Sequence, residues 1–149
     1  MNSDRRTVLK LLGAVAVTAF WPLRALAEFV RPDKAFEGES MQATFAGLGG
    51  TPEKSADVIL ETPEIAENGA VVPVSVSSKI PGTEQLWILI EKNPNPLAAG
   101  FQFPDHTEPF AAIRVKVAQT CNIYAVARAK GKLYMAGHEV KVTLGGCGG

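Results

Sequence analysis

The sequence predicts an all-β protein: an immunoglobulin-like sandwich of about seven strands, preceded by a short N-terminal helix. Two observations favour the sandwich. Beyond Pro52, apolar and polar residues alternate at the period of a half-buried strand. Turn residues interrupt this alternation about every ten residues. A third observation favours the helix, since apolar residues from Asp33 to Leu48 recur at helical spacing until Gly49-Gly50-Thr51-Pro52 ends the pattern.

The candidate strands follow one another along the chain. Their segments are 58–61, 72–76, 86–90, 98–103, 110–117 and 121–128, with a last hairpin region at 132–144. Gly131 and Gly137 are expected at turns or bulges of that last region. Pro73 has no N–H to donate to a ladder, so its strand is expected at a sheet edge or beside a bulge.

The segment 86–90 reads Leu-Trp-Ile-Leu-Ile and is apolar on both faces. A strand of this kind is central in its sheet or has its second face covered by another element. Trp87 and Leu89 are therefore candidates for a subunit interface. The alternative, a helix of the same chain packing over them, remains open from the sequence.

The segment 1–27 has the pattern of a signal peptide. Arg5-Arg6 precede an apolar stretch that ends in Ala25-Leu26-Ala27, a small-x-small cleavage site. The paired arginines resemble the twin-arginine signal, which exports folded proteins across the bacterial inner membrane. The stretch is shorter than the roughly 18 to 20 residues of a membrane span, and Arg24 interrupts it. We expect export to the periplasm, with no membrane attachment after cleavage.

Cleavage is expected to leave one domain at 28–144, followed by the segment 145–149. It removes four of the 15 basic and one of the 15 acidic side chains, which leaves a net charge of −3. A mildly acidic chain gives no indication of a nucleic-acid partner or of binding to an anionic membrane.

The segment 145–149 reads Gly-Gly-Cys-Gly-Gly. Glycine has no side chain to bury and loses the most backbone entropy on ordering, so we expect a flexible arm. The arm residues are Gly145, Gly146, Gly148 and Gly149, and they present one side chain, Cys147. Two glycine spacers let this cysteine extend on the order of 10 Å beyond the last strand, at about 3.5 Å per residue. The composition favours a covalent carrier whose cysteine enters the active sites of partner enzymes.

Cys121 is the second cysteine and leaves alternatives open. A Cys121–Cys147 disulfide would pin the arm and leave a periplasmic binding module. Cys121 alternates with Ile123, Ala125 and Ala127, which favours a small buried side chain on a strand. A further alternative makes Cys121 a resolving thiol for Cys147.

An enzymatic role for this chain is not expected. Cys147 has no His, Lys or Arg near it in the sequence to favour its thiolate. An ordinary thiol, with a pKa of about 8.5, is only a few per cent ionised near neutrality, so activation must come from partner enzymes. His106 and His138 lack the spacing of a metal site, and we expect no metal and no cofactor.

Four parts of the sequence carry a family resemblance: the twin-arginine leader, PEIAENGAVVPV at 63–74, EKNP at 91–94 and EVKVTLGGCGG at 139–149. The chain resembles the SoxY family, the sulfur-carrier subunits of the periplasmic Sox thiosulfate-oxidising system. The resemblance covers nearly the whole chain, and GGCGG after a strand is its most specific part. It implies that Cys147 is the attachment site for sulfur.

The resemblance also implies partners. A SoxZ-like small β subunit, exported as a folded passenger, would form a heterodimer and cover Trp87 and Leu89. A haem enzyme similar to SoxAX would join thiosulfate to Cys147, and a manganese hydrolase similar to SoxB would release sulfate from the thiosulfate-derived adduct. Haem and manganese belong to these partners. Cys121 is additional to the single cysteine that the family needs.

Parts of the sequence are compatible with two other functions. Gly148-Gly149 is similar to the ending of ubiquitin-like carriers, which bear sulfur as a terminal thiocarboxylate. Such carriers need ATP, which an exported protein has left behind. A peroxidatic or thiol-disulfide enzyme would instead need a Cys147 of strongly depressed pKa.

Overall fold

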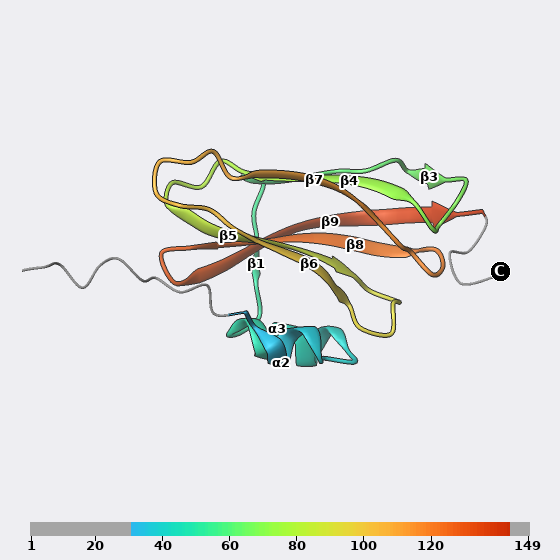
Figure 1. Cartoon of the computed structure of the whole chain (residues 1–149), viewed down its shortest axis with the longest axis horizontal. Helices are drawn as coiled ribbons and strands as arrows, with labels where there is room; N and C mark the ends of the chain where they lie inside the picture. Colours follow the sequence, from blue (N-terminus) through green and yellow to red (C-terminus); the bar gives the residue numbers. More distant parts are fainter. Residues whose placement is uncertain (1–30, 144–149) are drawn as a thin grey trace, which may run out of the picture. The chain divides into compact units, whose positions relative to one another are not determined.

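The structure is a computed structural model that describes residues 31–143 of the chain. The predicted signal peptide at 1–27 and the predicted arm at 145–149 lie outside the described residues. Two short helices and nine strands are found within the described part (Figure 1). The helices are α2 (Asp33–Phe36) and α3 (Met41–Leu48). The strands are β1 (Glu53–Lys54), β2 (Val58–Glu61), β3 (Ile65–Ala66), β4 (Val72–Ser78), β5 (Thr83–Ile90), β6 (Leu97–Gln102), β7 (Phe110–Val115), β8 (Cys121–Ala129) and β9 (Lys132–Val142).

The strands form two sheets that face each other, which confirms the predicted β sandwich. The larger sheet has the order β1-β9-β8-β5-β6, and β3 pairs with β9 outside this path. The smaller sheet has the order β2-β4-β7. β1 and β3 pair with β9 in parallel, and the other neighbours are antiparallel.

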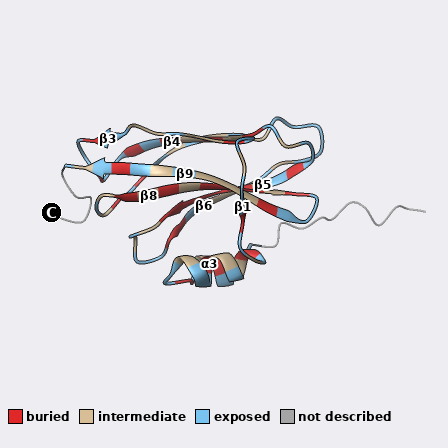
Figure 2. Cartoon of the chain, turned by 180° about the vertical axis from the view of Figure 1, so that it is seen from behind, coloured by how far each residue is buried: buried red, intermediate tan, exposed pale blue. Residues whose placement is uncertain are grey.

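Alternating apolar residues from both sheets fill the space between them, and buried residues line β5 and β8 in Figure 2. β4 contributes Val72, Val74 and Val76, whose side chains are at most 1% exposed. The intervening residues of β4, from Pro73 to Ser77, are exposed or half-buried. This one-sided burial is the period-two pattern that predicted the strand.

The predicted single helix at 33–48 is wrong, because the structure has two helices with a break at 37–40. Ser40 is extended, with φ −146° and ψ 158°, and its Oγ accepts a hydrogen bond from the Ala43 amide over 3.2 Å. Ser40 thereby caps the start of α3 and fixes the break. Gly49, at φ 106°, ends α3 in the left-handed conformation that glycine favours. No helix of residues 31–143 is long and apolar enough to cross a membrane.

The two helices cover the outer face of the larger sheet. Trp87 and Leu89 are 1% and 0% exposed, and they lie in a cluster with residues of both helices. The expectation that they form a subunit interface is therefore corrected: the intrachain alternative holds. The guanidinium of Arg128 lies 5.2 Å from the centre of the Trp87 ring and donates a hydrogen bond to the Leu48 carbonyl at the end of α3.

The predicted hairpin at 132–144 is also corrected, since β9 is one strand that pairs with β8 along its length. Gly131, at φ 76°, forms the predicted turn before it. Gly137 lies within the strand, where an added Cβ atom would clash with the Tyr124 ring. This glycine makes room for an aromatic side chain and marks no turn.

Pro73 lies in the central strand of the smaller sheet, so the expected edge strand is corrected. It pairs with Arg114 of β7, whereas the pairing of β4 with β2 begins only at Ser75. At Pro73 the central strand thus has a single neighbour, which explains why a residue without an N–H is tolerated there.

Candidate functional site

β9 ends at Val142, and Thr143 is the last described residue before the segment that contains Cys147. The end of this strand is held on one side by β3, which pairs with it in parallel. The Thr143 amide donates to the Ala66 carbonyl over 3.1 Å. The Thr143 hydroxyl donates to the Glu67 carbonyl over 3.0 Å. We call residues 141–143 the arm root.

A second loop holds the arm root from the other side. The Val142 amide donates to Oγ1 of Thr120 over 2.9 Å. Lys92 Nζ donates to the Thr120 carbonyl over 3.1 Å. The side-chain amide of Asn93 donates to the Lys116 carbonyl over 2.7 Å, and its oxygen accepts from the Ala118 amide over 3.1 Å. These bonds fix the loop at 116–120, which in turn holds β9.

Three of the segments that carry the family resemblance meet at the arm root. Residues 64–67 flank it through β3, and residues 91–94 support the loop at 116–120. The third segment contains the arm root itself. The sequence alone did not predict that these segments meet or that Thr120 and Thr143 hold the end of β9. The available signal in the sequence was that each of these threonines lies at the end of a loop or strand, and threonines are common at such positions.

We predict that Thr120→Val loosens the arm root without unfolding the domain. The substitution leaves the Val142 amide without its acceptor, which costs about 0.5 to 1.5 kcal/mol of unfolding free energy. Amide hydrogen exchange at Val142 should become faster while that of the β5 core stays slow. Thr107→Val, in the loop before β7, is the matched control and should leave Val142 unchanged. Equal protection of Val142 in both variants would contradict the role of Thr120.

Cys121 is buried at the start of β8, with 3% of its surface exposed, among residues of the core between the sheets. It is a free cysteine. Burial raises the pKa of its thiol above the ordinary value. A hydrogen bond with the Lys92 backbone is the largest effect that lowers this pKa, and the nearby Glu91 carboxylate raises it further. The prediction of a small buried side chain is confirmed, and the thiol is poorly placed to react.

We therefore predict that Cys121 resists alkylation in the folded protein at neutral pH. The raised pKa keeps the thiol protonated, and burial excludes the reagent. With Cys147 replaced by Ser, a maleimide reagent should label Cys121 only after denaturation, as measured by intact mass. Rapid labelling of the native protein would show that this thiol is accessible and would reopen its role as a resolving cysteine.

The two histidines do not come together in the structure. His138 lies on β9, and His106 lies in the loop before β7 with φ 65°. Among residues 31–143 no group of three His, Cys, Asp or Glu side chains is arranged to hold a metal ion.

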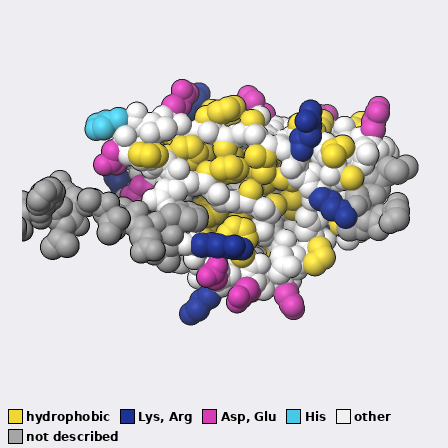
Figure 3. Space-filling view, in the orientation of Figure 1, with side chains coloured by type: hydrophobic (Ala, Val, Ile, Leu, Met, Phe, Trp, Pro, Cys, Tyr) yellow, Lys and Arg dark blue, Asp and Glu magenta, His cyan; other side chains and the backbone are white. Residues whose placement is uncertain are grey.

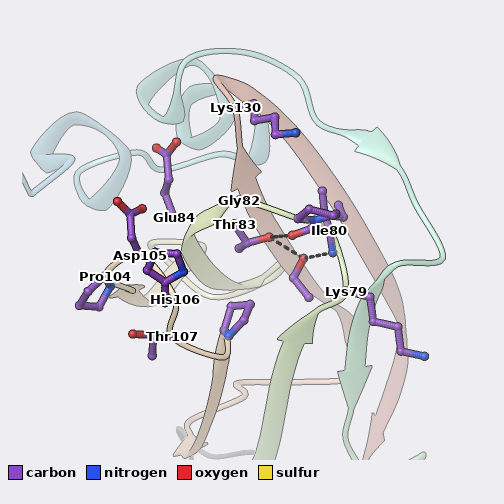
Figure 4. Close-up of a pocket in the computed structure, with 13 residues that line it drawn as sticks. Lys79, Ile80, Gly82, Thr83, Glu84, Pro104, Asp105, His106, Thr107 and Lys130 are labelled. Atoms are coloured by element: carbon purple, nitrogen blue, oxygen red, sulfur yellow. Dashed lines mark hydrogen bonds between the residues drawn. The ribbon is translucent and has the colours of Figure 1, made fainter.

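His106 lines a cleft of about 610 Å³ formed by the loop at 79–82, the start of β5 and the loop at 104–109 (Figure 4). Below these loops, the Ser78 and Thr83 hydroxyls bond each other over 2.8 Å. Thr83 also donates to the Ile80 carbonyl over 2.8 Å, so the hydroxyl pair fixes the turn. The cleft lies where β4 and β6 end, at the opposite end of the sandwich from the arm root.

The fold and the site define a class of protein: a small β sandwich with a firmly held last strand and a buried inner cysteine. Residues 42–147 match the model of the family described as sulfur oxidation protein SoxY. The match covers well over half of the chain and includes Cys147. The chain belongs to the SoxY family.

Among solved structures, the chain is similar to the sulfur carrier protein SoxY from Chlorobium limicola f. thiosulfatophilum, with 41% identity and a TM-score of 0.62. That likeness covers 68% of this chain and 94% of the Chlorobium chain. A superoxide reductase (neelaredoxin) variant from Ignicoccus hospitalis is 20% identical with a TM-score of 0.50, and covers 57% of this chain and 78% of its own. At that identity it shows the fold alone. No curated protein matches the chain.

Proposed function

We propose that this chain carries sulfur intermediates of thiosulfate oxidation covalently on Cys147 and presents them to partner enzymes. The observation that carries the proposal is the SoxY family match, which extends to Cys147, in a chain whose other cysteine is buried. The similar Chlorobium protein is named a sulfur carrier. The arm root supports the role because it gives the terminal segment a fixed starting point on the domain.

The loading step is an oxidation at sulfur. The Cys147 thiolate and thiosulfate form an S–S bond and give a cysteine S-thiosulfonate. Two electrons leave, and a SoxAX-like haem enzyme accepts them. Loading therefore depends on a partner, because no residue near Cys147 in the sequence is placed to ionise the thiol or accept electrons.

The unloading step is a hydrolysis. Water attacks the terminal sulfonate sulfur, the S–S bond to that sulfur breaks, and sulfate leaves with release of two protons. A sulfane sulfur remains on Cys147 for further oxidation. A SoxB-like hydrolase supplies this reaction, so the chain itself is a carrier protein and not an enzyme.

The remaining expectations belong to the same proposal. The chain is exported folded by the twin-arginine route and works in the periplasm, together with a SoxZ-like small β subunit. The segment 1–27 is removed on export, and Gly145, Gly146, Gly148 and Gly149 give Cys147 its reach.

Mass spectrometry of the protein purified without reductant tests the proposal. Added mass of sulfur or thiosulfate on the C-terminal peptide, lost on reduction, is the expected result. Protein from cells grown without a reduced sulfur source is the matched control. Absence of any adduct on Cys147 after thiosulfate and the partner enzymes are supplied would overturn the proposal.

The second candidate is a binding module pinned by a Cys121–Cys147 disulfide. The burial of Cys121 disfavours it. In the same experiment, this disulfide would join the Cys121 and Cys147 peptides, and their combined mass would be lower by two hydrogens. Mass on the terminal carboxylate would instead indicate thiocarboxylate chemistry.

A further inference from the structure

The turn between β3 and β4 contains the one asparagine of the chain that is followed by glycine, Asn68-Gly69. The turn lies at the end of the sandwich where β9 ends (Figure 1), away from the hydrophobic band that crosses the middle of the face in Figure 3. Asn68 is exposed, and its Oδ1 accepts a hydrogen bond from the Ala70 amide over 2.8 Å. The side chain therefore folds back over the peptide bond that joins it to Gly69, as in an Asx turn.

This arrangement meets the requirements of succinimide formation, in which a backbone nitrogen attacks the carbon of the preceding side-chain amide. The Asx turn holds Cγ of Asn68 beside the Gly69 nitrogen, and holding two reacting atoms together lowers the barrier between them. Glycine adds no Cβ atom to obstruct the approach. The Ala70 N–H points at Oδ1, the atom on which negative charge develops during the attack. A donor in that place stabilises the charge.

We propose that Asn68 is a site of spontaneous covalent modification, where the side-chain amide of the folded protein is converted into aspartate and isoaspartate. The Gly69 nitrogen forms a bond to Cγ, the bond from Cγ to the side-chain nitrogen breaks, and ammonia leaves with the proton of the Gly69 amide. Water then opens the five-membered ring. Breaking the bond from the ring nitrogen to Cγ gives aspartate. Breaking its bond to the main-chain carbon gives isoaspartate, which is linked to Gly69 through its side chain.

The three other asparagines of residues 31–143 lack these features. Asn93 and Asn95 each precede a proline, whose nitrogen has no proton to lose in the attack. Asn122 is half-buried in β8, and its side-chain amide donates to the Glu91 carboxylate over 2.9 Å. The residue after it is Ile123, whose branched Cβ crowds the attacking nitrogen. These three asparagines are therefore internal controls for Asn68.

Isoaspartate at position 68 changes the length of the backbone between two anchors of the turn. On one side of Asn68, the Glu67 carbonyl accepts the bond from the Thr143 hydroxyl over 3.0 Å. On the other side, the Gly69 carbonyl accepts a bond from the Val117 amide over 2.7 Å. Isoaspartate inserts a CH₂ group into the main chain between these two carbonyls. Because backbone bond lengths are fixed, we expect at least one of the two hydrogen bonds to lengthen and weaken.

The two products differ in their backbone and share the same charge. Both replace a neutral amide by a carboxylate next to Glu67 in the sequence. Aspartate keeps the normal main chain, and its carboxylate can still accept the bond from the Ala70 amide, so the Asx turn persists. Isoaspartate alone carries the longer main chain. A comparison of the two products therefore separates the effect of the backbone from the effect of the charge.

The reaction at Asn68 stands apart from the carrier chemistry on Cys147. It consumes water and releases ammonia, and neither a thiol nor a partner enzyme takes part. Its consequence reaches the arm only through the arm root, which the turn holds at Thr143, and through the loop at 116–120, which the turn holds at Val117. A chain modified at Asn68 keeps Cys147 but holds the arm root less firmly. Absence of the reaction would leave the carrier proposal untouched.

Peptide mapping of the purified protein during incubation at neutral pH tests the modification. We expect the Asn68 peptide to show the mass of an amide-to-acid exchange at least roughly tenfold sooner than the peptides of the three other asparagines. Ala70→Pro removes the N–H that points at Oδ1 and should slow the reaction about threefold to tenfold, whereas Ala70→Gly keeps this N–H and is the matched control. Equal rates in these two variants would overturn the role of the Ala70 amide. Reaction of Asn68 only in the urea-unfolded chain would overturn the proposal.

Amide hydrogen exchange tests the consequence for the arm root. In the isolated isoaspartate form, exchange at Val117 or Thr143 should be about threefold to tenfold faster, the range expected when one hydrogen bond is lost, while the β5 core stays slow. Freshly prepared Asn68→Asp protein has the added charge on a normal backbone and should exchange like the parent. Unchanged exchange at both residues in the isoaspartate form would overturn the link to the arm root. Equally fast exchange in Asn68→Asp would overturn the backbone explanation.

Discussion

Replacing Cys147 by alanine is expected to abolish thiosulfate-dependent loading and to leave the free energy of unfolding within about 0.5 kcal/mol of the parent. The loss is complete because Cys121 is buried and its thiol is held protonated by a raised pKa. The domain is unaffected because the substituted residue has only glycines beside it, with no side chains to bury. Intact mass after incubation with thiosulfate and the partner enzymes measures loading, and thermal unfolding measures stability.

Cys121→Ala is the matched control and should give the opposite pattern. Loading of Cys147 should persist, whereas removal of a buried sulfur from the core costs about 1 kcal/mol. If the Cys121 variant also fails to load at unchanged stability, the two cysteines act together and the single-site carrier is contradicted. A large loss of stability in Cys147→Ala would instead mean that the terminal segment packs on the domain.

The sandwich could be predicted because the order of apolar and polar residues along a strand depends on which of its faces is buried. Val72, Val74 and Val76 alternate with residues that face outward, and a half-buried strand requires this period. The same local logic identified Cys121 as a core residue, since it alternates with apolar partners on β8. Adjacent residues of a strand show which face is buried, so these strands could be predicted without knowledge of distant contacts.

What the sequence left open depends on contacts between distant segments. The apolar second face of β5 indicated that Trp87 is covered, but an intrachain helix and a partner subunit give the same local pattern. The break in the helix pattern at 33–48 is the exception, since it is fixed locally by the Ser40 side chain, and the apolar spacing that continues across it concealed this cap. The arm root escaped prediction because Thr120 contacts Val142 only where the loop at 116–120 meets the end of β9 in space.

Trp87→Ala is expected to lower the free energy of unfolding by about 3 to 5 kcal/mol, the second large effect that the structure predicts. The indole is 1% exposed between the larger sheet and the two helices. It also lies beneath the Arg128 guanidinium. At Gly100 a Cβ atom would come within 2.8 Å of the ring, which shows how closely β6 packs against it. Removing the ring opens a cavity under α2 and α3. Chemical denaturation at several protein concentrations would measure the resulting loss of unfolding free energy.

Ile65→Ala, at an apolar residue that is 58% exposed, is the control and should cost less than about 0.5 kcal/mol. Comparing the two variants distinguishes two explanations for the apolar second face of β5. If Trp87 served an interface, its removal would weaken association and spare the isolated chain. If it is the centre of the helix-covered cluster, the loss appears in the monomer and is the same at every concentration. The burial of Trp87 by α2 and α3 predicts the second outcome.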